Sequence, residues 1–486
     1  MHWGNMHTKS ALAAVGAVLC LLTASLGGAA PASADAIPAA ETALTVRTQA
    51  LPPGVQPPTL AELRAGTGAG KLERFAMEEP HAGVPREFVG PATADRPVAR
   101  TPSALSAQAR GEISPLAASY PQPPRTMTQE ECKQGLQGGK VFYLKSRFAM
   151  CAGTQFVQTW AKDGKPVGQS SFTLWVISTV PSRTDRTVHY QYLFTDFVKT
   201  GTTQTSGLKI NTDADLTTWP SQTTKKQGGE VPPTKTFDAL KADPEYLHTV
   251  LHEPGQGRGP DDVVTMAYEP FVSITYPAPY VPPQTGRTRV GFLIAQWDTA
   301  SYLFNKNGGG DPKKAGGAVF PVMVTLPYST QTGAPEQAVA QHLDDAHHRP
   351  GITKPDNPNK NVPGFDNKHP LHRLFHDEKR KDANRNTAVA TCAQHWGSDY
   401  ATSDPAGPRE CDEFPFASTY EGAAHPRYNS SAAKDNYSAR PLRKADNGAA
   451  GNILQTFLDR NRIVDGFING QEKTDYELDA YYVKIS

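Results

Sequence analysis

Two short stretches near the C-terminus carry most of the structural information in this chain of 486 residues. Residues 411–419 read CDEFPFAST, and residues 446–452 read DNGAAGN. An apolar stripe over residues 453–458 follows, as expected for an amphipathic helix. The order is a strand that bears two acids, a turn, a second strand, and a helix entered through Asp446-Asn447. We therefore predict a strand–strand–helix unit in this region.

A unit of this shape can hold one divalent cation between an acid or amide on the helix and an acid near the end of the first strand. Hydrolysis of a phosphodiester needs little more, because the cation neutralises the nonbridging oxygen and the leaving alkoxide while one base activates water. Oxygen ligands favour Mg²⁺ or Mn²⁺ over softer metals. We accordingly expect Mg²⁺ or Mn²⁺ as the cofactor.

The two neighbouring acids of the first strand have different roles in this interpretation. Side chains alternate along a regular strand, so Asp412 faces one way and Glu413 the other. Both could point into one site only if the strand bulged, and Pro415 makes an edge or a bulge plausible. We assign Asp412 as the general base and keep Glu413 as the second choice. The alternative is that both acids merely solvate an edge strand.

The motif CDEFPFASTYEG, followed by D-N-x-x-x-G-x-x-L at the start of a helix, resembles the NucA/NucB family of secreted bacterial deoxyribonucleases. The resemblance covers roughly residues 360–486. It implies a small α+β domain with a ββα-metal-like core, in which an acid stands where most of that superfamily has histidine. It also implies a DNA substrate.

The resemblance assigns roles residue by residue. Asp412 resembles the general base, with Glu413 as further acidic support, so both are candidate catalytic residues. Asn447 resembles the metal ligand on the helix, and Glu421 a second acid near the metal. The candidate phosphate contacts are Arg409, Arg427, Arg440, Arg443 and Lys444.

Composition adds less than these motifs. The formal net charge of +1 does not indicate nucleic acid by itself, so any DNA-binding charge must be local. The segment 368–385 contains six lysines and arginines. Such a run is usually a solvated face, but beside a nuclease site it would also form a phosphate-binding edge.

The changes in composition and apolar pattern along the chain divide it into five expected segments. Cationic Lys9, an apolar run and small residues up to Ala36 are typical of a signal peptide, so we expect a secreted, extracellular protein without stable membrane insertion. Short apolar runs bounded by Gly, Pro and Asp predict a β-rich sandwich or barrel-like domain of unknown role. The expected segments are a signal peptide at 1–36, a disordered Ala/Pro-rich spacer or pro-segment at 37–115, the β-rich domain at 116–332, a polar linker at 333–361 and the nuclease-like domain at 362–486.

The expected linker contains a cluster of histidines and acids that begins with His342, Asp344 and Asp345. Metal binding by a pair such as His342 and Asp345 is one hypothesis. We favour the other, a solvated helix end before Pro350.

Four cysteines remain once Cys20 of the apolar leader is set aside. An even number in an exported chain favours disulfides over zinc, since no CxxC pair is present. Local pairing is the simplest of the three possibilities. We expect the bonds Cys132–Cys151 and Cys392–Cys411.

The leading hypothesis is a secreted, metal-dependent endonuclease that cleaves DNA with little sequence preference, since no base-reading motif is visible. Two alternatives stay open. The chain could be a secreted polymer- or surface-binding protein with an inert nuclease-like domain. It could also be a secreted antibacterial nuclease toxin, in which case an inhibitor or immunity protein is an expected partner.

Export predicts removal of the leader after Ala34 or Ala36, because each completes a small-x-small site after the apolar run. N-terminal sequencing of protein from the culture medium measures this directly. An intact Met1 on the soluble protein would contradict the signal-peptide interpretation.

Overall fold

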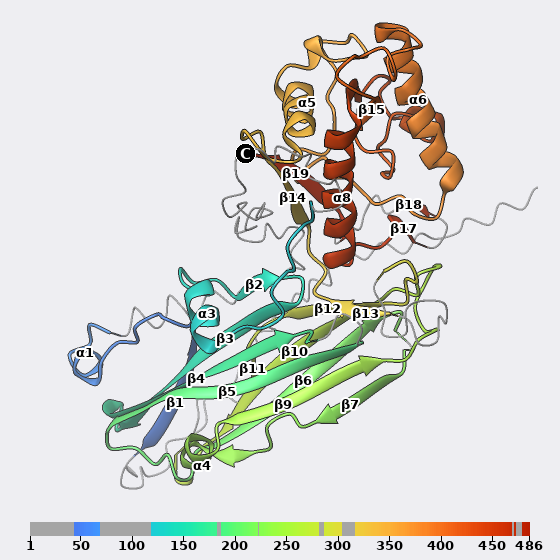
Figure 1. The fold of residues 1–486 in the computed structure, drawn as a ribbon. Coiled ribbons are helices and arrows are strands. Elements are labelled where there is room, and N and C mark those ends of the chain that lie inside the picture. Colours follow the sequence, from blue (N-terminus) through green and yellow to red (C-terminus); the bar gives the residue numbers. More distant parts are fainter. Residues whose placement is uncertain are drawn as a thin grey trace, which may run out of the picture. The chain divides into compact units, whose positions relative to one another are not determined.

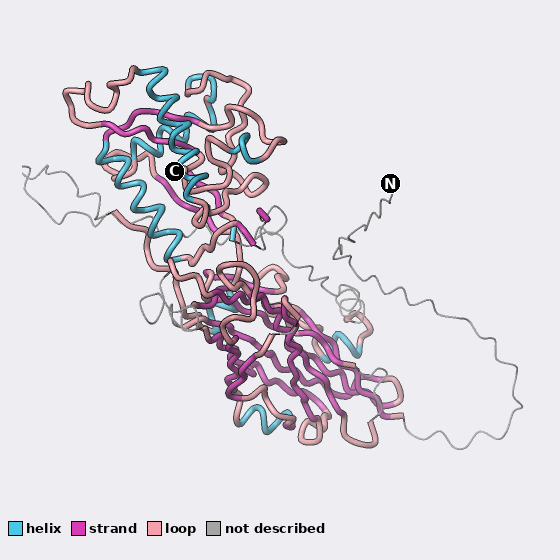
Figure 2. The backbone as a smooth tube through the Cα atoms, turned by 90° about the vertical axis from the view of Figure 1, so that its right-hand side faces the viewer, coloured by secondary structure: helices cyan, strands magenta, loops and turns pink. Residues whose placement is uncertain are grey.

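The computed structural model describes residues 43–68, 118–181, 186–221, 223–280, 286–303, 316–468, 471–472 and 479–486 (Figures 1 and 2). The expected signal peptide and most of the expected spacer lie outside these residues. In the part of the chain that is described, no helix combines the length and the apolar character that crossing a membrane requires.

The β-rich region consists of two curled sheets, as Figure 2 shows by its long strands. The strand order in the first sheet is β1-β3-β4-β5-β9-β7, with β2 beside β3. The bounds are β1 Leu44–Leu51, β2 Phe142–Ser146, β3 Ala149–Lys162, β4 Lys165–Thr179, β5 Thr187–Gly201, β7 Lys225–Gly229 and β9 Glu245–His252.

The second sheet has the order β13-β12-β10-β6-β8, with β11 beside β10. Its strands are β6 Lys209–Trp219, β8 Lys235–Thr236, β10 Val264–Thr275, β11 Arg287–Arg289, β12 Leu293–Asp298 and β13 Gly317–Val319. Three short helices accompany the sheets, namely α1 Leu60–Arg64, α3 Gln129–Gly135 and α4 Phe237–Ala242.

One hydrophobic core joins the inner faces of the two sheets. Along β5, Val188, Tyr190 and Tyr192 are fully buried and alternate with half-buried residues, as the period of two predicts. They pack with Trp160 of β3 and Trp297 of β12 in the same cluster. The prediction of a β-rich region is confirmed, with half-barrel-like curled sheets.

Part of the expected disordered spacer belongs to this region. Strand β1 pairs antiparallel with β3, so that Val46 lies opposite Trp160 and is fully buried. The local composition is too poor in apolar residues to indicate this, because the burial comes from pairing with a partner more than one hundred residues away.

The C-terminal region contains most of the helical turns (Figure 1). Its helices are α5 Gln337–His348, the 3₁₀ turn η2 Pro350–Ile352, α6 Glu378–Trp396, α7 His425–Tyr428 and α8 Lys444–Arg460. Its strands are β14 Val324–Tyr328, β15 Arg409–Phe414, β16 Ser438–Arg443, β17 Phe467–Ile468, β18 Gln471–Glu472 and β19 Tyr481–Ile485.

The expected linker at 333–361 differs from the structure. Helix α5 lies inside it, and its Val339 and Leu343 are buried in the core of the C-terminal region with Phe457 of α8. Strand β14, placed by sequence in the β-rich domain, pairs in parallel with β19, with Leu326 opposite Val483. The many polar residues of α5 lie on its outer face, and they make the helical spacing of its buried apolar residues hard to recognise in the sequence.

The strand–strand–helix unit lies at the centre of this region. Strands β15 and β16 are antiparallel, with Asp412 opposite Arg440, and α8 begins at Lys444 directly after β16. Helices α5, α6 and α8 all pack against these two strands.

Both expected disulfides are present. Cys132 of α3 bonds Cys151 of β3, and Cys392 of α6 bonds Cys411 of β15, each with a sequence separation of 19. The second bond ties β15 to α6 one residue before Asp412.

The equal loop lengths make each disulfide a control for the other. The double variant Cys392→Ser/Cys411→Ser should lose about 3 kcal/mol of unfolding free energy by the chain-entropy model, and the β15 amides should exchange hydrogen faster. Cys132→Ser/Cys151→Ser should lose a similar free energy but leave β15 protected. Denaturant unfolding and hydrogen-exchange mass spectrometry measure both. Unchanged β15 exchange in the first variant would show that the tether is dispensable for this strand.

Candidate active site

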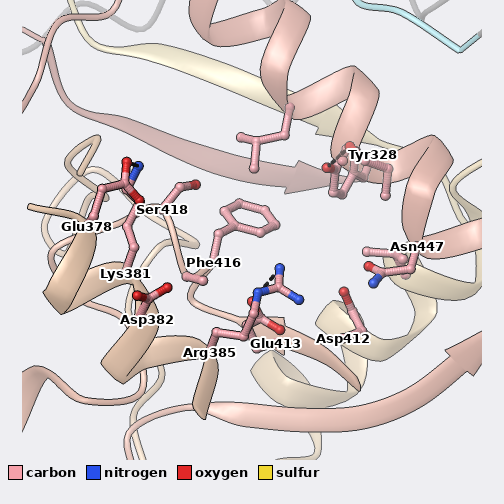
Figure 3. Close-up of a pocket in the computed structure, with 15 residues that line it drawn as sticks. Tyr328, Glu378, Lys381, Asp382, Arg385, Asp412, Glu413, Phe416, Ser418 and Asn447 are labelled. Carbon is pink, nitrogen blue, oxygen red and sulfur yellow. Dashed lines mark hydrogen bonds and ion pairs between the residues drawn. The ribbon is translucent and has the colours of Figure 1, made fainter. Parts of the chain in front are cut away.

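A cavity of about 310 Å³ opens beside the strand–strand–helix unit (Figure 3). Its apolar wall includes Phe416, Val339 and Leu454. Its charged and amide side chains come from three elements: Glu378, Lys381, Asp382 and Arg385 from α6, Asp412 and Glu413 from β15, and Asn447 from α8. A concave site with few convergent polar groups is the usual form of a binding or active site.

The local fold explains why these residues meet. Strand β16 runs antiparallel to β15 and continues directly into α8, so the first turn of α8 returns Asn447 to the acids of β15. On α6, the four polar residues have helical spacing and share one face. The structure thus brings Asp412, Glu413 and Asn447 to one cavity.

Asp412 of β15 is almost fully buried and accepts a hydrogen bond from a histidine of helix α5. Its Oδ2 lies 2.6 Å from Nδ1 of His342 in α5, and Nε2 of His342 lies 2.7 Å from Oγ of Ser438 in β16. His342 is fully buried. The solvated helix end favoured from sequence is therefore incorrect for this residue.

Glu413 faces the opposite side of β15 from Asp412. Its Oε1 lies 3.5 Å from the Arg385 guanidinium of α6, and pairing with β16 continues through Phe414 without a register shift. Both acids line the same cavity although the pairing of β15 with β16 has no bulge.

The environment of Glu413 disfavours its charged form. Burial raises the pKa of Glu413 from 4.5 to about 7, although the nearby Arg385 opposes the shift. Asp412 adds a smaller upward contribution through like-charge repulsion. A buried carboxylate of this kind gains from any additional positive charge in the cavity.

Asn447 contributes an amide at the cavity. Its Nδ2 donates a hydrogen bond of 3.2 Å to Oε2 of Glu410, which holds the amide by one end. Within the described residues, no hydrogen bond to its Oδ1 is formed. That oxygen is a hard, neutral donor of the kind that Mg²⁺ accepts.

The other candidate residues lie elsewhere. Glu421 does not line the cavity, and its carboxylate binds His372 through Nδ1 at 2.7 Å and through the backbone N–H at 3.0 Å. None of the five candidate phosphate contacts lines the cavity. Arg440 pairs with Asp345 of α5, Arg409 with Asp404, and Lys444 with Glu410. Arg443 and Arg427 are both exposed.

The cations at the cavity are Lys381 and Arg385, which belong to the basic run 368–385. The run itself was visible in the sequence. The helical spacing of Glu378, Lys381, Asp382 and Arg385 was the available signal that these four share a face. His342 gave no comparable signal, because its contacts lie 70 and 96 residues away.

The donors at the cavity fit a hard cation with few protein ligands. No group of three or more His, Cys, Asp or Glu side chains that could hold a metal occurs in the described part of the chain. The carboxylate of Glu413 and the free amide oxygen of Asn447 are oxygen donors, and Glu413 lacks full charge compensation. Such a site leaves most coordination positions to water or substrate, as Mg²⁺ prefers.

Comparison with known proteins finds a match, and it lies in this region. No curated protein and no solved structure gives a significant match to the chain. Residues 364–467 match the family model described as Deoxyribonuclease NucA/NucB. The matched segment contains α6, β15, β16 and α8, and therefore Asp412, Glu413 and Asn447. Residues 364–467 of the C-terminal region are thus similar to the NucA/NucB deoxyribonuclease family.

Proposed function

We propose that the chain is a secreted endonuclease that hydrolyses DNA phosphodiester bonds with the help of a divalent cation. The observation that carries the proposal is the meeting of Asp412, Glu413 and Asn447 at one cavity inside the segment that matches the nuclease family. The two disulfides and the leader sequence support an extracellular location.

In this proposal β15, β16 and α8 form a ββα-metal unit. Glu413 and Asn447 hold the cation, with Mg²⁺ or Mn²⁺ favoured by their oxygen donors. When bound, the cation supplies positive charge for the scissile phosphate and its leaving oxygen.

Asp412 acts as the general base. Its Oδ2 is engaged by His342, and in the described part of the chain no hydrogen bond to its Oδ1 is formed. Oδ1 is thus the atom that takes the proton from the attacking water. Half-buried Lys381 and exposed Arg385, which both line the cavity, contact phosphate oxygens and orient the backbone of the nucleic acid.

Weak sequence preference is part of the proposal. The cations of α6 that reach the cavity can pair with phosphates, which are the same in every sequence. No helix-turn-helix or zinc module occurs among the described elements to read base edges.

Two variants separate the role of the base from that of the metal ligand. Asp412→Asn keeps an amide oxygen that can accept from His342, but it removes the base, so plasmid cleavage at saturating Mg²⁺ should slow by about 10²–10⁴-fold. Asn447→Ala should instead raise the half-saturating Mg²⁺ concentration, by roughly 10- to 100-fold. Wild-type cleavage should stop with a chelator.

Circular dichroism serves as the folding control for both variants. If Asp412→Asn cleaves plasmid at the wild-type rate at saturating Mg²⁺, Asp412 is not the general base. Wild-type protein that cleaves DNA equally well in a chelator would contradict the requirement for a cation.

The raised pKa of Glu413 predicts an unusual dependence of stability on pH. Between pH 4.5 and about 7 the folded state retains a proton that the unfolded state releases, so unfolding free energy falls as pH rises through this window. The penalty is complete above about pH 7 and is on the order of 3 kcal/mol. In a chelator, Glu413→Gln should lose this pH dependence and be more stable than wild type at pH 8.

Thermal melting from pH 4 to pH 8 measures the effect. Glu378→Gln, on the exposed side of the same cavity, is the matched control and should follow the wild type. Mg²⁺ at pH 8 should raise the melting temperature of wild type more than that of Glu413→Gln. Parallel pH curves for wild type and Glu413→Gln would contradict the assigned environment.

A further inference from the structure

We propose that His342 is a positioning residue for the nuclease reaction, which orients the Asp412 carboxylate toward the cavity. This inference rests on the proposed function of Asp412. His342 lies on α5, outside the segment 364–467 that matches the nuclease family. The catalytic unit therefore extends upstream of the matched segment.

The hydrogen bonds of His342 fix its ring completely. An ionised carboxylate only accepts hydrogen bonds, so Nδ1 of His342 donates to Oδ2 of Asp412 at 2.6 Å. Nε2 of His342 is hydrogen-bonded to the hydroxyl of Ser438 at 2.7 Å. Both ring nitrogens are used, and His342 and Ser438 are fully buried.

This bond selects one orientation of the Asp412 carboxylate. Because Oδ2 is held by His342, Oδ1 is left for the cavity, on the side where Figure 3 places Asn447. A carboxylate without this bond could rotate, and both of its oxygens would compete for the same donors. Misplacement of a reacting group by about 1 Å costs on the order of 10²-fold in rate.

Helix α5 is itself anchored at the position that this role requires. Asp345 lies three residues after His342 and accepts an ion pair from Arg440 at 2.8 Å. Arg440 is the cross-strand partner of Asp412 in the β15–β16 pairing. His342 and Asp345, which lie on one face of α5, thus contact Asp412 and Arg440, the two members of one cross-strand pair. Slippage of α5 would break both contacts together.

A buried histidine that served only the core would be replaceable by any side chain that satisfies the same polar groups equally well. Apart from Asp345, which pairs with Arg440, the other buried residues of α5 are apolar, including Val339 and Leu343. The histidine stands at the one position of the face that reaches a carboxylate lining the cavity.

Two substitutions in the full chain test the two hydrogen bonds of His342 separately, because each keeps only one of them. In His342→Asn the amide nitrogen takes the place of Nδ1 and can still donate to Asp412. In His342→Gln the amide oxygen takes the place of Nε2 and keeps the bond from Ser438, while the bond to Asp412 is lost. His348→Gln, an exposed histidine on the same helix, is the control.

Cleavage of plasmid DNA is measured at saturating Mg²⁺, with kcat, KM and the half-saturating Mg²⁺ concentration determined separately. We expect His342→Gln to lower kcat by roughly 10²-fold, with KM and the Mg²⁺ requirement unchanged. His342→Asn should recover most of kcat, and His348→Gln should equal wild type. A purely structural role predicts equal losses of melting temperature in the Asn and Gln variants and no difference in kcat.

The same losses are then measured in the Asp412→Asn background. If His342 acts through Asp412, His342→Gln should cause no further loss there. Additive losses, or equal kcat for the folded His342→Gln and wild-type proteins, would overturn the inference. Should His342→Gln not fold, a large loss of kcat in folded His342→Asn would overturn it. Absence of cleavage by wild type is a different result, which would contradict the proposed function itself.

Discussion

The antiparallel register that sets Asp412 opposite Arg440 is the constraint on which the rest of the site depends. Once this pair is fixed, β16 ends at Arg443 and α8 starts with its first turn beside β15, which places Asn447. The same register turns Asp412 toward α5 and Glu413 toward α6. A shift of one residue would exchange the two acids between a histidine and an arginine, and neither would keep its environment.

Opposite faces of one strand give the two acids different electrostatic surroundings. Asp412 receives a hydrogen bond from a histidine that is itself hydrogen-bonded to Ser438. Glu413 is equally buried, and this burial raises its pKa although a partly exposed guanidinium lies at 3.5 Å. Two adjacent carboxylates with different environments suit two different tasks, proton transfer and cation binding.

The sequence predicts those parts of the site that are local. The motifs around Asp412 and Asn447 place both residues on the correct elements, and the cysteine spacing leads to the disulfides that are present. What depends on distant partners is not predictable in this way. His342 shows its role only through Asp412 and Ser438, and β1 becomes a strand only beside β3. Family resemblance also stops short of α5, which packs in the core of the C-terminal region although it lies in the segment expected to be a linker.

The disulfide between Cys392 and Cys411 makes this arrangement depend on the redox state of the cell compartment that holds the protein. Thiols stay reduced in the cytosol of most cells, and disulfides form after export. In the proposed secreted nuclease, β15 would lack its covalent link to α6 immediately before Asp412 until export. The site around Asp412 would then be completed only away from the DNA of the cell that makes the protein.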